Sequence, residues 1–289
     1  MANITVKKAM TADLEELSQF ACIINGIKER SSNFCYKDPE HIRQEFKESI
    51  NSGNLVECRI ASHLVGILNC YVDHEKHNAD CSLLIEAGQN YDSIAKLLLD
   101  ETRKQFDSSM KYTFFFPKEN TDCSNFLDKI GAHREVNEYC LLLKLGNLKL
   151  PTSSYKVAEL PEEYYNQFIS LHDSIFPEIY ISGKEVINDI GKNHYIYAII
   201  ENGQIIAYSV LRSGGKNRVT AEIVAVRDGF RRKGYGRVVL SYLACQAFDT
   251  YGMDYVDLIV DSDNENAIKL YLDLGFVVES ENCCYTIRQ

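Results

Sequence analysis

The stretch VAVRDGFRRKGYGRVVLSYL, residues 224–243, decides the fold of the C-terminal half of this chain. It begins inside a run of mostly apolar, partly β-branched residues, TAEIVAV (220–226), which is typical of a strand. After RRKGYG (231–236), apolar residues recur at helical spacing as far as Tyr251, and Gly252 then provides a stop signal. The sequence therefore predicts a strand, a glycine-rich turn and a helix in direct succession.

This predicted corner suits an anion. Gly234 and Gly236 allow the backbone to approach phosphate oxygens closely, and the helix N-terminus adds the positive end of its dipole. Residues 151–289 hold 13 Lys and Arg against 19 Asp and Glu, and five of the basic residues lie between 227 and 237. These five are Arg227, Arg231, Arg232, Lys233 and Arg237. A positive charge confined to one corner indicates a single phosphorylated ligand. Binding of nucleic acid would require a broad basic face, which this half of the chain lacks.

Two common phosphate-binding motifs are absent from this corner. A dinucleotide fingerprint needs a third glycine where Val239 stands. A P-loop needs glycine, four residues, and then glycine, lysine and a hydroxyl residue, which the corner does not have. The pattern that remains is R-x-x-G-x-G over residues 231–236.

A second motif follows the first in the same half of the chain. NENAIKLYLDLGF (264–276) begins about 30 residues after RRKGYG, and together the two motifs resemble the acetyl-CoA signature of the GNAT superfamily of N-acetyltransferases. The resemblance covers roughly residues 220–277. It implies an α/β (α+β) fold with a twisted mixed central sheet and helices on both faces. It also implies acetyl-CoA as cosubstrate and no metal.

The resemblance assigns a role to each matched position. The turn would hold the coenzyme pyrophosphate, the preceding strand would present its backbone to the pantetheine arm and the thioester carbonyl, and Asn264 would contact the coenzyme. These cofactor-binding candidates are Val224, Ala225, Val226, Arg231, Arg232, Lys233, Gly234, Tyr235, Gly236, Arg237 and Asn264. Tyr271 would protonate the leaving thiolate.

Acetyl transfer to an amine also needs a base, because only the neutral amine is a nucleophile. Glu222 is the candidate, since alternation along the strand places it on the same face as Val224 and Val226. Structural alternatives stay open. Asn264 could cap the helix that follows it, Tyr271 could be a core residue, and Glu222 could be a solvated or ion-paired strand residue.

The two halves of the chain share one plan. A shift of 144 residues places Asn120 on Asn264, Gly131 on Gly275 and Cys140 on Cys284 without a gap. A period this long indicates duplicated domains. KLGNLKLPTSSYKV (144–157) has the composition of a linker. We therefore expect tandem GNAT-like domains: a degenerate one over residues 1–146, a linker over 147–154 and an acetyltransferase domain over 155–289.

The first half is expected to lack the coenzyme. Its matching turn, EAGQNYDS (86–93), has one glycine, no basic residue and two acids, Glu86 and Asp92, which would repel a pyrophosphate. Leu127 stands at the tyrosine position, or Phe126 if one residue is inserted, and neither has a hydroxyl. A scaffolding or substrate-shaping role is the prediction for this half.

Composition limits where the protein works. The 289 residues are 45% hydrophobic and 25% charged, with a formal net charge of −10. No apolar run approaches a membrane span and no signal peptide is visible, which favours a cytoplasmic location. Ten cysteines occur without a C-x-x-C pair, so reduced thiols are expected. A metal-like cluster, His74, His77 and Cys81, falls in a segment typical of a hairpin loop, and no metal is expected there.

The sequence thus predicts direct acetyl transfer from acetyl-CoA to a primary amine on a small molecule or peptide. The excess negative charge favours a cationic acceptor. The alternative is a non-catalytic, coenzyme-A-binding or structural module, and a hydroxyl acceptor or a longer acyl donor also stays open. The acceptor pocket is expected around residues 173–193. No nucleic acid or membrane partner is expected, and a monomer or a homodimer is compatible with the sequence.

Overall fold

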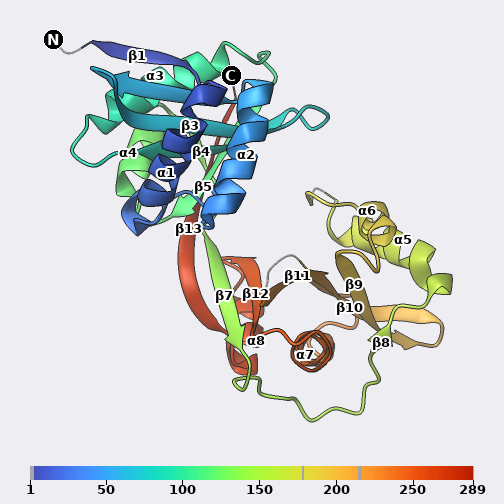
Figure 1. The fold of residues 1–289 in the computed structure, drawn as a ribbon. Helices are drawn as coiled ribbons and strands as arrows, with labels where there is room; N and C mark the ends of the chain where they lie inside the picture. Colours follow the sequence, from blue (N-terminus) through green and yellow to red (C-terminus); the bar gives the residue numbers. More distant parts are fainter. Residues whose placement is uncertain (1–2, 178, 214–216, 289) are drawn as a thin grey trace. The chain divides into compact units, whose positions relative to one another are not determined.

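The computed structural model describes residues 3–177, 179–213 and 217–288. The chain forms two compact units (Figure 1). The first comprises residues 1–138 and 281–289, and the second comprises residues 139–280.

The first unit has a sheet covered on both faces. Its strands lie in the order β1 (Ile4–Lys8), β2 (Leu55–Ile60), β3 (His63–Asp73), β4 (Asn78–Ile85), β5 (Lys111–Pro117) and β13 (Val277–Arg288), with β6 (His133–Arg134) also on β13. Among these, β4 and β5 are parallel, and the pairs β1–β2, β2–β3, β3–β4, β5–β13 and β6–β13 are antiparallel. One face packs on α1 (Leu14–Asn25) and α2 (Pro39–Ser52), the other on α3 (Tyr91–Arg103) and α4 (Thr121–Lys129), and 3₁₀ turns span Thr11–Asp13 and Lys28–Arg30.

The second unit repeats this arrangement. Its strands lie in the order β7 (Glu138–Lys144), β12 (Tyr255–Asp261), β11 (Arg218–Val226), β10 (Gln204–Ser213), β9 (His194–Glu201) and β8 (Ala158–Glu159). One face packs on α5 (Tyr165–Ile175) and α6 (Gly183–Asn188), the other on α7 (Tyr235–Cys245), a π-helical turn (Gln246–Thr250) and α8 (Glu265–Leu274), and a 3₁₀ turn spans Glu162–Tyr164. A mixed sheet with helices on both faces confirms the predicted fold class.

The closing strands are exchanged between the two halves of the sequence. β7 follows the first half in the chain, yet Leu141 and Leu143 are buried in the core of the second unit. Tyr285 and Ile287 on β13 come from the second half and are buried in the core of the first unit. The predicted boundaries follow the order of the sequence repeat, whereas the compact units follow the packing of these two strands.

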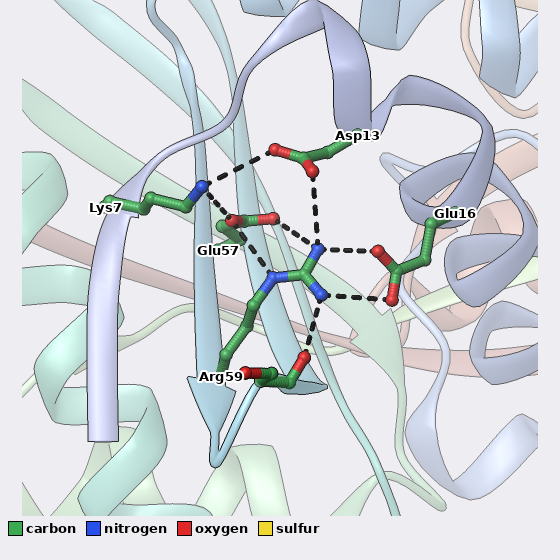
Figure 2. Close-up of polar contacts among 6 residues, drawn as sticks. Lys7, Asp13, Glu16, Glu57 and Arg59 are labelled. Atoms are coloured by element: carbon green, nitrogen blue, oxygen red, sulfur yellow. Dashed lines mark hydrogen bonds and ion pairs between the residues drawn. The ribbon is translucent and has the colours of Figure 1, made fainter. Parts of the chain in front are cut away.

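An ion cluster around the buried Glu57 carboxylate links β1, β2 and α1 of the first unit (Figure 2). Glu57 on β2 has a fully buried side chain, and Lys7 Nζ on β1 and Arg59 Nη2 each lie 3.1 Å from its carboxylate. Arg59 Nη2 also lies 2.7 Å from Glu16 on α1, and Arg59 Nη1 donates to the backbone oxygen of Ser62. Hydrogen bonds to Glu16 and Glu57 raise the pKa of Arg59.

Replacing Arg59 with methionine is expected to lower the free energy of unfolding by about 3 kcal/mol, because the buried Glu57 carboxylate loses its main partner. Urea denaturation measures this. Arg43→Met is the matched control, since Arg43 pairs with Glu15 at 3.2 Å on the surface, and its expected cost is under about 0.5 kcal/mol. Equal losses in the two variants would contradict a special role for the buried pair.

Glu45 gives the stability of the protein a pH dependence. Burial raises the pKa of its carboxyl from 4.5 to about 7, although hydrogen bonds from Tyr71 and Asn69 lower it in part. The folded state therefore favours the protonated acid. This contribution to stability is complete below about pH 4.5 and is lost as the pH rises through 7.

At pH 8 we expect Glu45→Gln to be more stable than the wild type by about 2 kcal/mol, because the amide is neutral where the acid must ionise. At pH 4.5 the two proteins should be nearly equal in stability. Thermal unfolding at both pH values measures the difference. A difference that does not change with pH would show that Glu45 is ionised without penalty.

Candidate active site

The site begins where two parallel strands of the second unit diverge. β11 and β12 pair only over Arg218–Thr220 and Tyr255–Asp257, so from Ala221 to Val226 β11 stays paired with β10 on one side and has an open edge on the β12 side. A cavity of about 610 Å³ borders the end of β11, the corner into α7, and α8.

Most of the predicted cofactor-binding residues line this cavity. They are Val224, Ala225, Val226, Arg231, Arg232, Gly234, Tyr235, Gly236, Arg237 and Asn264, and of the predicted set only Lys233 is not in the lining. The lining also includes residues that the sequence analysis did not name as cofactor-binding: Ile175, Phe176, Phe230, Asn266, Ala267, Lys269, Leu270 and Asp273. Ile175 and Phe176 belong to the segment expected to form the acceptor pocket, of which Glu178 lies outside the described residues.

The N-terminus of α7 is left open toward a ligand. In the described part of the chain no side chain caps this helix, so its first N–H groups lack an internal partner. Gly234 precedes the helix with φ 89°, and Gly229 and Arg232 also have positive φ, 81° and 65°. An added Cβ at Gly234 would meet no atom within 4 Å, so the backbone angle alone demands glycine there.

By contrast, Asn264 caps α8. Its Oδ1 accepts a hydrogen bond from the N–H of Ala267 at 3.2 Å. This capping role is the alternative to coenzyme contact that the sequence left open. Asn264 also lines the cavity, so the same residue can cap α8 and contact a ligand.

The cations at the corner are less free than their number suggests. Arg227 Nε donates to the backbone oxygen of Ile205 at 2.8 Å, and Arg237 is paired with Asp273. Arg231 lies 3.0 Å from Asp228. Lys233 Nζ lies 5.1 Å from the ring centroid of Phe230. The corner thus combines an open helix terminus with a positive charge that neighbouring carboxylates partly offset.

Tyr271 lies beside the cavity and is not part of its lining. Its ring packs 6.0 Å from that of Phe276, within the core of the second unit, while the preceding residue, Leu270, lines the cavity. Burial raises the pKa of Tyr271 to about 12. The hydroxyl therefore keeps its proton at neutral pH.

Glu222 is the extra residue of a β-bulge. Val210 on β10 pairs with Ile223 and Leu211 pairs with Ala221, so Glu222 has no partner across the ladder. Bulges of this kind redirect a side chain and often occur beside active sites. Glu222 is not in the cavity lining, although Val224, two residues along the strand, is.

The Glu222 carboxylate is held by side chains that the sequence reasoning missed. Arg212 Nε lies 2.8 Å from Oε1, and the hydroxyl of Tyr180 donates to the same oxygen. His194 Nε2 lies 2.8 Å from Oε2, and His194 Nδ1 lies 2.8 Å from Oδ2 of Asp189. Only 3% of the Glu222 side chain is exposed.

In the corresponding region of the first unit, backbone groups at the helix N-terminus and on the strands form hydrogen bonds with other residues of the chain. Asn90 caps α3 through a hydrogen bond from the N–H of Ser93 at 3.1 Å. Arg30 donates to the backbone oxygen of Ile85 on β4 at 3.2 Å, and the N–H of Asn33 donates to that of Phe115 on β5 at 2.8 Å. Asn120 Nδ2 also binds the backbone oxygen of Ser31 at 3.0 Å. Residues 30–33 thus use polar groups at the ends of both strands.

The described residues, 3–177, 179–213 and 217–288, contain neither a metal-binding cluster nor a membrane-spanning helix. Within them, no cluster of three or more His, Cys, Asp or Glu side chains is arranged to hold a metal ion, and His74 and His77 lie in the turn between β3 and β4. None of the helices there has the length and apolar character needed to cross a bilayer.

A family of known proteins matches the second unit. Residues 156–276 match the family described as "Acetyltransferase (GNAT) family". No curated protein sequence matches the chain.

Solved structures share the fold along the whole chain. A GCN5-related N-acetyltransferase from Sphaerobacter thermophilus has a TM-score of 0.74 at 10% identity, covering 98% of this chain and 95% of that one. A tandem GNAT protein from the clavulanic acid biosynthesis pathway has a TM-score of 0.64 at 14% identity, covering 99% and 98%. A putative acetyltransferase from Pyrococcus horikoshii has a TM-score of 0.56 at 12% identity, covering 99% and 89%. Identities this low show a common fold.

Proposed function

We propose that the chain, an acyltransferase whose residues 156–276 match the Acetyltransferase (GNAT) family, transfers an acetyl group from acetyl-CoA to a primary amine. The observation that carries this proposal is the uncapped N-terminus of α7, which opens into a cavity lined by nearly all the predicted cofactor-binding residues.

The residues around the cavity fit a coenzyme with a pyrophosphate. The free N–H groups at the start of α7 and the guanidinium groups of Arg231 and Arg232 would hold the phosphates. The edge of β11 that β12 leaves open, Val224 to Val226, offers backbone groups for the amide-rich pantetheine arm. Bound in this way, the coenzyme supplies its acetyl group as a thioester.

The protein's own groups would move two protons. Glu222 takes a proton from the acceptor ammonium, so that the neutral nitrogen can attack the carbonyl carbon. The new C–N bond would form as the C–S bond breaks, Tyr271 would donate its hydroxyl proton to the sulfur that leaves, and the second proton lost by the attacking nitrogen would return to the Tyr271 oxygen. A backbone N–H of β11 directed at the carbonyl oxygen would stabilise the negative charge that develops there.

We propose a cationic acceptor, a polyamine-like small molecule or a lysine-bearing peptide, since the chain carries a net charge of −10. Ten cysteines without a C-x-x-C pair suit a reducing cytoplasm. One observation favours the second candidate, a coenzyme-binding module without turnover: neither Tyr271 nor Glu222 lines the cavity. The loss of a hydroxyl at Tyr271, argued in the Discussion, separates the two functions.

Isothermal titration of the intact chain with acetyl-CoA is expected to show one site per chain. Among the described residues, no side chain caps the N-terminus of α7 at the corner, whereas Asn90 caps the counterpart helix α3 and Arg30 and Asn33 bind the strands beside it. A stoichiometry of two would contradict the assignment of the first unit. An absence of binding would overturn the proposed transferase.

A further inference from the structure

Each ring nitrogen of His194 faces a carboxylate oxygen, and two ionised carboxylates need an N–H donor on both nitrogens, whereas a neutral imidazole has only one. Both ring nitrogens lie 2.8 Å from a carboxylate oxygen, Nδ1 from Asp189 and Nε2 from Glu222. Ionised carboxylates only accept hydrogen bonds, and a neutral imidazole has one N–H. Both contacts are hydrogen bonds when His194 has a hydrogen on each nitrogen. The cluster then holds His194 as a cation between two carboxylates.

Local backbone structure fixes His194 in this position. Asp189 is the C-cap of α6, and its backbone oxygen accepts from the N–H of His194 at 3.2 Å. His194 begins β9 and pairs with Arg212 across the ladder to β10. The two cationic side chains therefore come from neighbouring strand positions and hold opposite oxygens of the Glu222 carboxylate.

The charges around Glu222 balance. Glu222 and Asp189 supply two negative charges, and His194 and Arg212 supply two positive ones. From the loop after α5, Tyr180 contributes a hydroxyl whose pKa is raised by burial and by its hydrogen bond to Glu222. Two other charged groups act on this cluster. The Asp257 carboxyl on β12 interacts electrostatically with Arg212, and Lys192 interacts electrostatically with Asp189. A nearly fully buried Glu222 can therefore stay ionised.

We propose that His194, oriented by Asp189, is a positioning residue for acetyl transfer: with Arg212 it keeps the Glu222 carboxylate ionised and fixed at the β-bulge, ready to take the proton of the acceptor amine. This inference rests on the proposed function for its catalytic meaning. The charge state of His194 can be measured without any reaction.

The kinetic test compares the pH dependence of kcat in the wild type, His194→Gln and Asp189→Asn. The assay uses acetyl-CoA with spermidine or a lysine-containing peptide, whichever the wild type acetylates. His194→Gln keeps a hydrogen-bond donor and loses the positive charge, so the acidic limb of kcat should move to higher pH by about one unit. Asp189→Asn should give a smaller shift in the same direction. KM for acetyl-CoA should change less than about twofold in both, because neither residue lines the cavity.

His63→Gln is the matched control, since His63 pairs with Glu86 at 3.0 Å on the surface of the first unit. It should leave the pH profile unchanged. A fall in kcat by the same factor at every pH in the His194 and Asp189 variants would overturn the inference and leave a purely structural pair. If His194→Gln does not fold, Asp189→Asn, whose side chain is partly exposed, still decides between these outcomes.

A second measurement separates failure of this inference from failure of the proposed function. In protein labelled with ¹⁵N-histidine at pH 7.5, long-range ¹H–¹⁵N spectra should show one histidine with both ring nitrogens protonated, and Asp189→Asn should change that signal. A spectrum in which every histidine is neutral would overturn the inference. Wild-type protein that binds acetyl-CoA but acetylates no amine would overturn the function and leave the spectroscopic result valid.

Discussion

Glu222→Gln is expected to lower kcat by about 100- to 1,000-fold, because the amide cannot accept the proton of the acceptor ammonium. The change keeps the size of the side chain and its hydrogen-bonding capacity toward Arg212 and Tyr180. Since Glu222 lies outside the cavity lining, the affinity for acetyl-CoA should stay within about twofold of the wild-type value. Steady-state kinetics over a range of pH and calorimetric titration measure the two quantities.

The control for this variant is Glu279→Gln. Glu279 is ion-paired at the surface of the same unit, with Arg218 Nη2 3.4 Å away, so removing its charge should leave kcat nearly unchanged. A Glu222→Gln enzyme with full activity at neutral pH would mean that water, or another group, deprotonates the amine. A loss of acetyl-CoA binding would instead show that the bulge shapes the coenzyme site.

The corner into α7 is the part of the site that sequence predicts best, and the reason is local. Glycine at positive φ, a helix start without a capping side chain, and an Asn at the start of α8 all depend on residues within a few positions of one another. Each has its own sequence signal. Ten of the eleven predicted cofactor-binding residues therefore line one cavity, and their contact with a coenzyme stays a prediction.

The features that sequence could not predict depend on distant residues. The bulge at Glu222 is defined only by its register with Val210 and Leu211. Its partner His194 lies 28 residues earlier in the chain, at the start of another strand. The exchange of β7 and β13 is equally hidden, because an alternating strand carries the same pattern whichever sheet it joins.

The first unit also has a feature that local sequence could not predict. Its acidic turn, EAGQNYDS, predicts that it lacks a coenzyme for reasons of charge. The structure adds that residues 30–33 bind Ile85 and Phe115 at the ends of β4 and β5. Residues 30–33 and 115 are about 80 positions apart in the chain, so this contact has no local signal.

Tyr271→Phe is expected to lower kcat by about 100-fold with the affinity for acetyl-CoA nearly intact. A pKa of about 12 keeps the hydroxyl protonated, so at neutral pH it can donate a hydrogen bond to the sulfur as negative charge develops there. Removing one such donor from a transition state typically costs this much. The ring remains, so its packing on Phe276 should be preserved and the melting temperature should change little.

Tyr242→Phe is the matched control, because Tyr242 also packs in the core of the second unit, with its ring centroid 5.3 Å from that of Tyr197. Loss of that hydroxyl should leave kcat within about twofold. If Tyr271→Phe and Tyr242→Phe are both fully active, Tyr271 is a core residue and the thiolate leaves without a protein acid. If the wild type binds acetyl-CoA without turnover toward any amine, the coenzyme-binding module is the better description, and the absence of Tyr271 and Glu222 from the cavity lining is its physical reason.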